Sequence, residues 1–412
     1  MKTYTRYKDS GISWIGKIPE HWDTRRLKNT VTLICEKTSE LSLPYVGLEN
    51  IVSWTGNLIK GCYEPDADAN KFEKGDVLFS KLRPYLAKCF TANFQGKCSS
   101  ELLVLRNFQG ERDYLKNILL SFRFVDLVNA STYGTKMPRA NWGFIGNCII
   151  PLPPLEEQKS IAAYLDKKTE QINGLVAAKQ KQIELLKEYK QSLIANAVTK
   201  GINSKVKMKD SGISWIGNVP EHWQFMRAKY MFKKEKRDVR NNDEVVTCFR
   251  DGEVTLRKNR RTTGFTESLT EIGYQGIRKN DLVIHQMDAF AGAIGVSDSD
   301  GKGTSVYHCC TPLGNYNVFY YAFLLRVMAK KGFIQSLYRG IRERSSDFNF
   351  LVFGKQYLAI PPIDEQKQIV AYINERVSSI DTQISSIEKQ IANLNEYKQS
   401  LISDVVTGKV KV

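Results

Sequence analysis

The sequence predicts an α+β fold in which one unit, a mixed α/β domain followed by a long helix, occurs twice. Three observations predict it. Two nearly identical blocks open the halves of the chain, two similar blocks close them, and the closing blocks have the periodicity of a coiled coil. The 412 residues are enough for two or three domains of ordinary size.

The opening block of each half is duplicated almost letter for letter. Lys8–Gly16 reads K-D-S-G-I-S-W-I-G and recurs as Lys209–Gly217. Shortly after it, P-E-H-W also occurs in both halves, and we call residues 8–22 box 1 and residues 209–223 box 2. The segments between the opening and closing blocks resemble each other far less. The frame is duplicated while its contents differ, and we expect each half to be one structural unit.

The segment after each box is predicted to be a mixed α/β domain. Short β-rich runs bounded by Gly or Asn turns predict strands at residues 76–80, 102–105 and 281–284. Helical patterns follow at residues 114–128 and 319–331.

Each closing block predicts a long helix, over residues 153–202 and 361–412. Both blocks begin with two prolines and have carboxylates in the first turn, as helix N-termini prefer. Gly201 and Gly408 stand where the helices should end.

Both predicted helices carry an apolar seam with heptad spacing. The seam of the second helix runs from Val370 to Val405, and Lys398 is its one polar position. Lys190 occupies the equivalent position in the first helix, where it could set the register or face a partner. The two seams could pair antiparallel within one chain. The alternative is two amphipathic helices, each packed on its own domain.

The charge balance favours a polyanionic partner. The chain has 60 Lys and Arg against 44 Asp and Glu, a net charge of +16, which suits phosphate binding but is by itself weak evidence. Arg can pair with guanine and Asn or Gln with adenine, whereas Lys more often holds phosphates. Residues clustered near the predicted strand ends are therefore candidate DNA contacts, with solvated loop charges as the alternative. In the first half these are Lys81, Arg83, Lys88, Lys136, Arg139 and Asn141; in the second half they are Arg257, Lys258, Arg260, Arg261, His285, Gln286, Arg342 and Arg344.

No catalytic centre, cofactor site or metal site is predicted in this chain. Gly56–Gly61 has the glycine spacing of a P-loop, but Cys62 follows where Lys and Ser or Thr are needed. The N/D-P-P-Y/F run of amino-methyltransferases does not occur. The cysteines form no C-x-x-C pair, and the histidines are scattered. His21 and His222 belong to the duplicated boxes, and we expect a structural role for them.

No membrane contact is expected either, because the sequence has no apolar run of about 18 residues. The N-terminal residues lack the apolar core of a secretory signal. We therefore expect a cytoplasmic protein.

Along nearly its whole length, the chain resembles the specificity subunits of type I restriction-modification enzymes. The twin boxes carry the resemblance, together with P-P-L-E-E-Q-K at residues 153–159 and P-P-I-D-E-Q-K at residues 361–367. Residues 75–88 and 134–139 also look like phrases of the family's recognition domains.

The resemblance implies a non-catalytic subunit with two target-recognition domains, residues 1–152 and 203–360. Two long helices, paired as an antiparallel coiled coil, would separate the domains in a pseudo-twofold internal repeat. Each domain would read one half of a bipartite, asymmetric site in double-stranded DNA.

The resemblance also implies partners that supply the chemistry. Two methyltransferase subunits would carry S-adenosylmethionine, and restriction subunits using ATP and Mg could join them. Carried onto this chain, Lys81, Arg83, Lys88, Lys136 and Arg139 become DNA contacts of the first domain. The second domain has Leu282–Met287 in place of the first domain's Lys81–Arg83 stretch, so its half-site should differ. The rival interpretations are a self-contained nuclease or methyltransferase, and a coiled-coil scaffold that binds nucleic acid without sequence preference.

Overall fold

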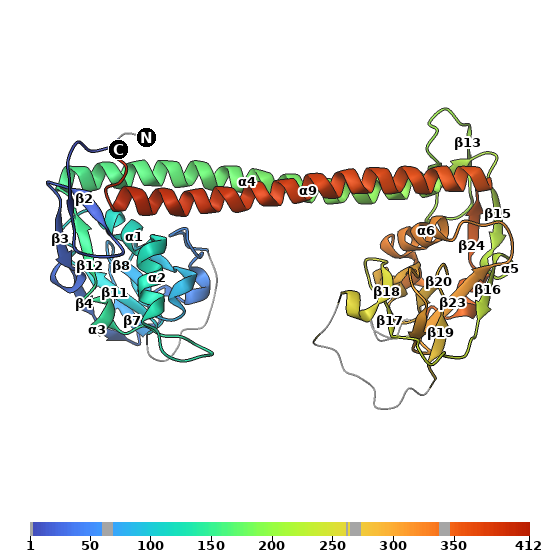
Figure 1. Cartoon of the computed structure of the whole chain (residues 1–412), viewed down its shortest axis with the longest axis horizontal. Helices are drawn as coiled ribbons and strands as arrows, with labels where there is room; N and C mark the ends of the chain where they lie inside the picture. The colour runs from blue at the N-terminus through green and yellow to red at the C-terminus, as the bar shows by residue number, and fades with distance from the viewer. Residues whose placement is uncertain (1–2, 60–68, 261–262, 264–272, 338–346) are drawn as a thin grey trace. The chain divides into compact units, whose positions relative to one another are not determined.

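The computed structural model describes residues 3–59, 69–260, 263, 273–337 and 347–412. It divides the chain into two units, which share the two long helices (Figure 1). Unit 1 comprises Met1–Lys181 and Ile387–Val412, and unit 2 comprises Gln182–Ser386. Each unit therefore contains one of the two α/β segments and one half of each long helix.

In unit 1 the chain enters and leaves the α/β segment on neighbouring strands. Box 1 forms a hairpin of β1 (Tyr7–Asp9) and β2 (Lys17–Pro19). The next strand, β3 (Asp23–Arg26), pairs antiparallel with β12 (Ile149–Leu152), which immediately precedes the first long helix. The other elements are β4 (Thr32–Ile34), β5 (Lys37–Thr38), β6 (Tyr45–Val46), β7 (Ala69–Phe72), β8 (Val77–Ser80), β9 (Cys89–Thr91), β10 (Gly96–Cys98), β11 (Leu102–Arg106), α1 (Arg112–Leu120), α2 (Phe122–Ala130), α3 (Trp142–Ile145) and the 3₁₀ turns η1 (Leu27–Asn29), η2 (Leu48–Asn50) and η3 (Pro84–Leu86).

An antiparallel sheet of order β4-β11-β8-β9 forms the centre of unit 1. Successive strand residues point to opposite faces, so Phe79 joins the core with the helices, which includes Phe124 of α2. Its neighbour Leu78 points the other way, into a second cluster with Phe72 and Phe90. The predicted strands 76–80 and 102–105 are confirmed as β8 and β11.

One predicted helix is broken in the structure. The pattern at residues 114–128 belongs to two helices, α1 and α2, which meet at Ser121. Ser121 has an extended backbone, and its hydroxyl donates to the carbonyl of Ile118 at the end of α1. Such a hydroxyl bond competes with continued helix, and the apolar periodicity does not report it.

Unit 2 repeats this plan with different contents. Box 2 forms the hairpin β13 (Met208–Asp210) and β14 (Asn218–Pro220), and β15 (Gln224–Arg227) pairs with β24 (Tyr357–Ile360). The central sheet has the order β16-β23-β20-β21, which corresponds to β4-β11-β8-β9. The remaining elements are α5 (Ala228–Met231), β16 (Phe232–Glu235), β17 (Val246–Cys248), β18 (Val254–Leu256), η4 (Arg257–Asn259), β19 (Gln275–Ile277), β20 (Leu282–His285), η5 (Ala289–Ala291), β21 (Ile294–Val296), β22 (Gly301–Gly303), β23 (Tyr307–Pro312), α6 (Val318–Lys330), α7 (Phe333–Ser336) and α8 (Phe350–Lys355). The strand predicted at 281–284 and the helix predicted at 319–331 are confirmed as β20 and α6.

The long helices are α4 (Leu155–Lys200) and α9 (Ile363–Val406). Each ends before a glycine in the left-handed conformation, Gly201 and Gly408, both at φ 73°. The helices run side by side and antiparallel within each unit (Figure 1). In unit 1, Lys398 Nζ donates to Asn173 Oδ1 (3.0 Å), and in unit 2 Lys190 Nζ donates to both Asp381 carboxylate oxygens (2.7 Å). The predicted α+β fold with two paired long helices is thus confirmed.

Candidate nucleic-acid interface

One carboxylate ties each box to the start of a long helix. In unit 1, Trp22 Nε1 donates to Glu157 Oε2 (2.6 Å), and His21 Nε2 lies 2.8 Å from Glu157 Oε1. In unit 2, Trp223 Nε1 donates to Glu365 Oε1 (3.1 Å), and His222 Nε2 lies 2.8 Å from Glu365 Oε2. The box histidines are therefore part of the frame, as the duplication predicted.

Each box also lies against the end of the other long helix. A Cβ atom on Gly408, just beyond α9, would collide with Pro19 of box 1, and one on Gly201, just beyond α4, would touch Trp223 of box 2. Buried tyrosines of the α/β segments bind the same helix ends. Tyr114 Oη donates to the carbonyl of Val406 (3.3 Å), and Tyr320 Oη donates to that of Val198 (2.9 Å). The duplicated residues thus fix each α/β segment to the helix pair.

Unit 1 has a cleft of about 310 Å³ at the end of β8, where three predicted contacts come together. These are Lys81, Arg139 and Asn141. The cleft is also lined by Leu33, Ile34, Cys35, Asn70, Ser100, Glu101, Leu102, Leu103, Tyr133, Ala140 and Trp142. It therefore combines donors, one carboxylate and aromatic rings, the side chains that read base edges.

Arg139 is the most firmly held of the three. Its backbone N–H and carbonyl both bond to Tyr133, at 3.0 and 3.1 Å. Its side chain donates from Nε to Glu101 Oε1 (3.0 Å), and Nη2 lies 3.0 Å from the same oxygen. The hydrogen bond to Glu101 raises the pKa of the guanidinium.

The other predicted contacts of unit 1 have mixed roles. Arg83 Nη2 donates to the carbonyl of Lys136 (3.4 Å), so these two candidates lie together, and the Lys136 side chain is exposed. Lys88 Nζ donates to the carbonyl of Leu48 (2.5 Å), and burial lowers the pKa of its ammonium group. Asn141 Oδ1 accepts from the Gly143 N–H (2.7 Å) and caps α3. Lys88 and Asn141 therefore hold loops in place as well.

The basic cluster of unit 2 is partly neutralised by neighbouring carboxylates. Arg260 Nη1 donates to Asp251 Oδ2 and Glu253 Oε2, both at 2.8 Å, and its guanidinium lies 4.1 Å from the Phe249 ring centroid. Lys258 Nζ lies 2.5 Å from Glu244 Oε2, and Arg257 begins the turn η4. Three further candidates, Arg261, Arg342 and Arg344, lie outside the described residues.

At the end of β20, unit 2 presents different chemistry from unit 1. The Phe348 N–H donates to the carbonyl of Gln286 (3.1 Å), as the Ala140 N–H donates to that of Lys81 (2.9 Å), so Gln286 occupies the place of Lys81. Fully buried Phe348 stands where unit 1 has the small Ala140 beside its cleft. Gln286 Nε2 donates to Asp347.

His285, the residue before Gln286, points into the fold. Its Nδ1 accepts from the Asp288 N–H (3.1 Å), and its ring packs edge-on against Tyr307 at 5.1 Å. Burial lowers the pKa of this imidazole. The side chain therefore supports the loop after β20.

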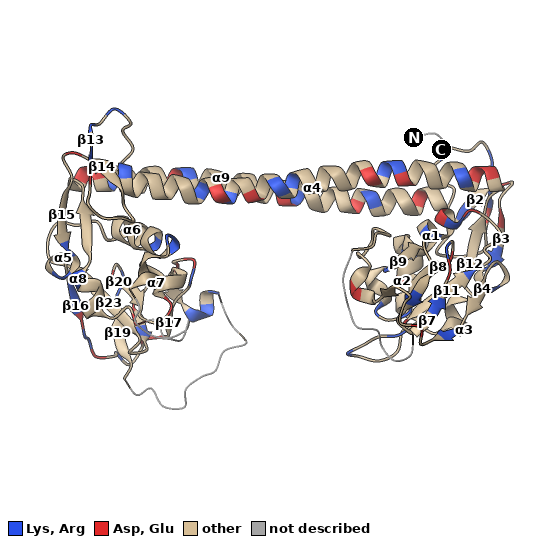
Figure 2. Ribbon diagram, turned by 180° about the vertical axis from the view of Figure 1, so that it is seen from behind, with Lys and Arg blue, Asp and Glu red and all other residues tan. Residues whose placement is uncertain are grey.

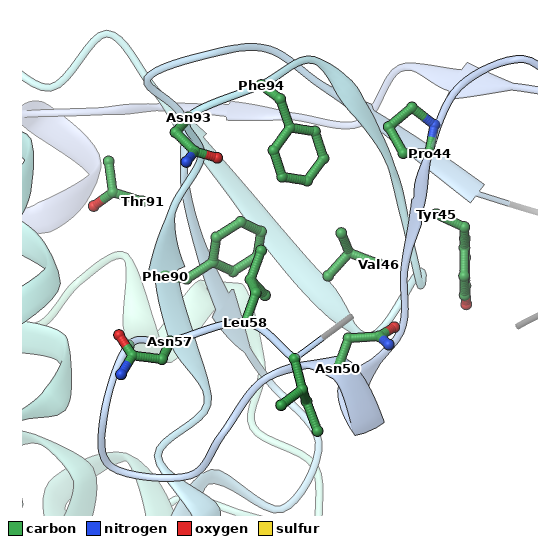
Figure 3. Close-up of a pocket in the computed structure, with 12 residues that line it drawn as sticks. Pro44, Tyr45, Val46, Asn50, Asn57, Leu58, Phe90, Thr91, Asn93 and Phe94 are labelled. Carbon is green, nitrogen blue, oxygen red and sulfur yellow. The ribbon is translucent and has the colours of Figure 1, made fainter. Parts of the chain in front are cut away.

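A second hollow of unit 1, about 880 Å³, holds none of the predicted contacts. Figure 3 shows aromatic and apolar side chains around it, among them Phe90, Phe94 and Leu58, with the amides of Asn50, Asn57 and Asn93. Among the residues that the structure describes, its lining has no carboxylate, histidine or cysteine. In the part of the chain that the structure describes, no three His, Cys, Asp or Glu residues group as metal ligands. No described helix is long and apolar enough to cross a bilayer.

The chain is similar to a known protein family and to several curated proteins. The family described as "Type I restriction modification DNA specificity domain" matches residues 19–185. The putative type I restriction enzyme MjaX specificity subunit of Methanocaldococcus jannaschii is 23% identical, over 97% of this chain and 96% of that protein. The type I restriction enzyme EcoDI specificity subunit of Escherichia coli is 28% identical, over 39% of each chain. Residues 19–185 thus match the type I specificity-domain family, and a curated specificity subunit is similar over nearly the whole chain.

Solved structures agree with the specificity-subunit fold. A chain from a structure of the type I R-M system superposes with a TM-score of 0.74 at 18% identity, covering 95% of this chain and 99% of that one. The HsdS subunit from Thermoanaerobacter tengcongensis gives a TM-score of 0.55 at 18% identity, covering 95% and 98%.

Several residues of the unit 1 cleft were not predicted from the sequence. Glu101, Asn70 and Trp142 line it beside the predicted contacts. Glu101 was not predicted because it is acidic and its partner Arg139 is distant in the sequence. A buried β-strand followed by a basic residue marks Lys81, but no comparable local signal marks Glu101.

Proposed function

We propose that this chain is the DNA-reading, non-catalytic subunit of a type I restriction-modification complex. Its two recognition domains, residues 1–152 and 203–360, each read one half of a bipartite, asymmetric site. The observation that carries the proposal is the duplicated frame around unlike residues at the end of the central strand. Glu157 and Glu365 hold the two boxes in the same way, whereas Lys81 is replaced by Gln286 at the end of the central strand.

The duplicated frame supports unequal half-sites on geometric grounds. Duplex DNA has a twofold relation between its strands, and readers built on repeated frames use that relation to place two half-sites. Different side chains in equivalent positions then select different bases in each half.

Partner subunits supply the chemistry in this proposal. Two methyltransferase subunits with S-adenosylmethionine methylate adenine, and restriction subunits that use ATP and Mg join them in the complete enzyme. The complex works in the cytoplasm. The helices α4 and α9 carry charged residues of both signs (Figure 2), which suits a protein partner better than DNA alone.

Methylome mapping tests the function directly. The chain is expressed with its methyltransferase in a host without other adenine methylation, and methylated adenines are mapped genome-wide. We expect one bipartite, asymmetric motif. The purified chain with S-adenosylmethionine and DNA should methylate nothing, and activity of the chain alone would contradict the proposal. Methylation without any motif would indicate a scaffold that lacks sequence preference.

A domain exchange tests the division of labour. Replacing residues 24–150, which run from within β3 to within β12, with the corresponding segment of another specificity subunit should change one half of the motif. The other half should stay as it was. A change in both halves would show that the domains do not read independently.

A further inference from the structure

We propose that Arg139, held in place by Glu101, reads a guanine in the half-site of unit 1, and that Glu101 thereby determines specificity as a positioning residue. The inference rests on the proposed function and deepens it by naming the base that one cleft selects. Three features of unit 1 and one contrast with unit 2 support it.

The backbone of Arg139 is fixed on both sides. Its N–H and carbonyl bond to Tyr133, and the next residue, Ala140, donates to the carbonyl of Lys81 at 2.9 Å. On the preceding side, the Arg83 N–H donates to the carbonyl of Pro138 at 2.7 Å. The Cα of Arg139 therefore cannot move without breaking several hydrogen bonds to other segments.

The side chain of Arg139 is fixed as well, and only one edge of its guanidinium is used. Nε and Nη2 face the Glu101 carboxylate at 3.0 Å. Nη1 and the second hydrogen of Nη2 point away from that carboxylate. This remaining pair of donors matches the O6 and N7 acceptors of guanine in the major groove. The Arg139 side chain is 39% exposed, whereas that of Glu101 is 21% exposed.

The carboxylate argues for a base rather than a phosphate. A phosphate bound to Arg139 would be repelled by Glu101, which lies about one hydrogen bond away. A G·C pair has no such conflict. Guanine presents acceptors to the arginine, and the N4 amino group of cytosine can donate a hydrogen bond to a carboxylate. Lys81, which lines the same cleft, supplies a positive charge for the backbone.

Unit 2 lacks this pair at the equivalent place. The Lys81 N–H donates to the carbonyl of Glu101 (3.0 Å), and the Gln286 N–H donates in the same way to Val306 (2.8 Å). Val306 therefore stands where unit 1 has Glu101, and it cannot orient an arginine. The two readers differ in this feature, so the guanine belongs to one half-site.

Base-analogue binding tests the contact. The chain in complex with its methyltransferase subunits is titrated with duplexes of the mapped motif. In these duplexes each guanine of the unit 1 half-site is replaced in turn by 7-deazaguanine, which lacks the N7 acceptor. At one position we expect the wild-type complex to bind at least about fivefold more weakly. The same replacement should not weaken the Arg139→Ala complex further.

A second set of variants tests Glu101 as a positioning residue. Glu101→Ala should lower the preference for guanine over adenine at that position at least about fivefold, while binding to non-specific duplex stays equal or rises. Glu101→Asp, which keeps the carboxylate, should restore part of the preference. Glu36→Gln removes a surface ion pair with Lys71 in the same unit, outside the cleft, and should leave the preference unchanged. If Glu101 had a purely structural role, Glu101→Ala would weaken binding to specific and non-specific duplex by the same factor.

The outcomes separate the two proposals. If the complex methylates a defined motif but 7-deazaguanine weakens binding of the wild-type and Arg139→Ala complexes equally at every position, the guanine contact is wrong and the proposed function stands. A unit 1 half-site with no guanine on either strand would also overturn the contact. If no motif is methylated, the proposed function itself fails.

Discussion

At the scale of single residues, the repeat identifies a histidine in an unfavourable place. His308 of β23 lies opposite Ile284 of β20, as Leu103 of β11 lies opposite Phe79 of β8. His308 is 2% exposed, and neither ring nitrogen has a hydrogen-bond partner among the residues that the structure describes. Burial, with the nearby charge of Lys234, lowers the pKa of His308 to about 4.

This histidine should make unit 2 sensitive to acid. Its folded pKa of about 4 lies below the ordinary value of 6.5, so the unfolded chain binds more protons between these values. The contribution of the neutral imidazole to the free energy of unfolding is fully present above pH 6.5 and falls by about 1.4 kcal/mol per pH unit toward pH 4. We predict that His308→Leu stabilises the protein at pH 7.5 and stabilises it more at pH 5. Urea unfolding of both proteins at the two pH values measures this, and an equal difference at both would contradict it.

The carboxylate of Glu157 is a second residue with a large expected effect. Trp22 is fully buried, and its indole N–H depends on Glu157. Glu157→Ala leaves that N–H without its acceptor, which should cost about 1–3 kcal/mol of unit 1 stability. Glu156→Ala is the matched control, because Glu156 lies in the same helical turn but its side chain is 83% exposed. Thermal unfolding measures the stability of both variants. Similar losses of stability would show that the two carboxylates stabilise unit 1 only through the helix dipole.

At the scale of elements, the two seam lysines have different partners on the opposite helix. Lys190 has a carboxylate partner in Asp381, but Lys398, which is only 5% exposed, has the neutral amide of Asn173. Burial accordingly lowers the pKa of the Lys398 ammonium group. The sequence left open whether these lysines set the register or face a partner, and the structure shows that each is paired across the helices.

Exchanging the partners should change the stability of the helix pair in opposite directions. Asn173→Asp gives Lys398 a carboxylate and should stabilise unit 1 by about 1 kcal/mol, or roughly 2–4 °C in its thermal midpoint. Asp381→Asn removes the carboxylate from Lys190 and should destabilise unit 2 by a similar amount. Calorimetry of both single variants and the double variant measures this. A loss of stability in Asn173→Asp would show that desolvation of the new charge dominates.

Element prediction from the sequence succeeded where periodicity decides the structure. The seams, the prolines and the terminal glycines placed α4 and α9 to within a few residues, because a long helix repeats its signal many times. The break between α1 and α2 was missed, because the apolar periodicity does not record the extended backbone at Ser121. Among the candidate contacts, Lys81 and Arg139 share a cleft, but His285 and Lys88 are occupied with holding loops.

At the scale of the whole molecule, α4 and α9 continue from one unit into the other, and each unit ends within both helices. A matched insertion of one heptad, between Lys181 and Gln182 and between Ser386 and Ile387, keeps every seam position in phase. Seven residues add roughly 10 Å of helix, which corresponds to about three base pairs. We predict that the gap in the methylated motif grows by about three base pairs while both half-sites stay unchanged.

The control for this prediction is the same heptad in α9 alone, which puts one half of the helix pair out of register and should abolish methylation. An unchanged gap in the double insertion would refute the helix pair as the spacer. We do not expect the same effect from an insertion in the linker 200–207. In the structure it follows the end of α4 and leads directly into box 2, so added residues there can loop out without lengthening either helix.

The sequence by itself determined the architecture: two copies of a frame, two long helices and unlike contents between them. Repetition and periodicity are written locally in the chain, so they can be read without coordinates. Only the tertiary structure decided which of the basic residues share a cleft, that Glu101 holds Arg139, and that Phe348 fills the corresponding place in unit 2. Those relations join residues far apart in the sequence, and they depend on strand register and side-chain volume, which no local pattern records.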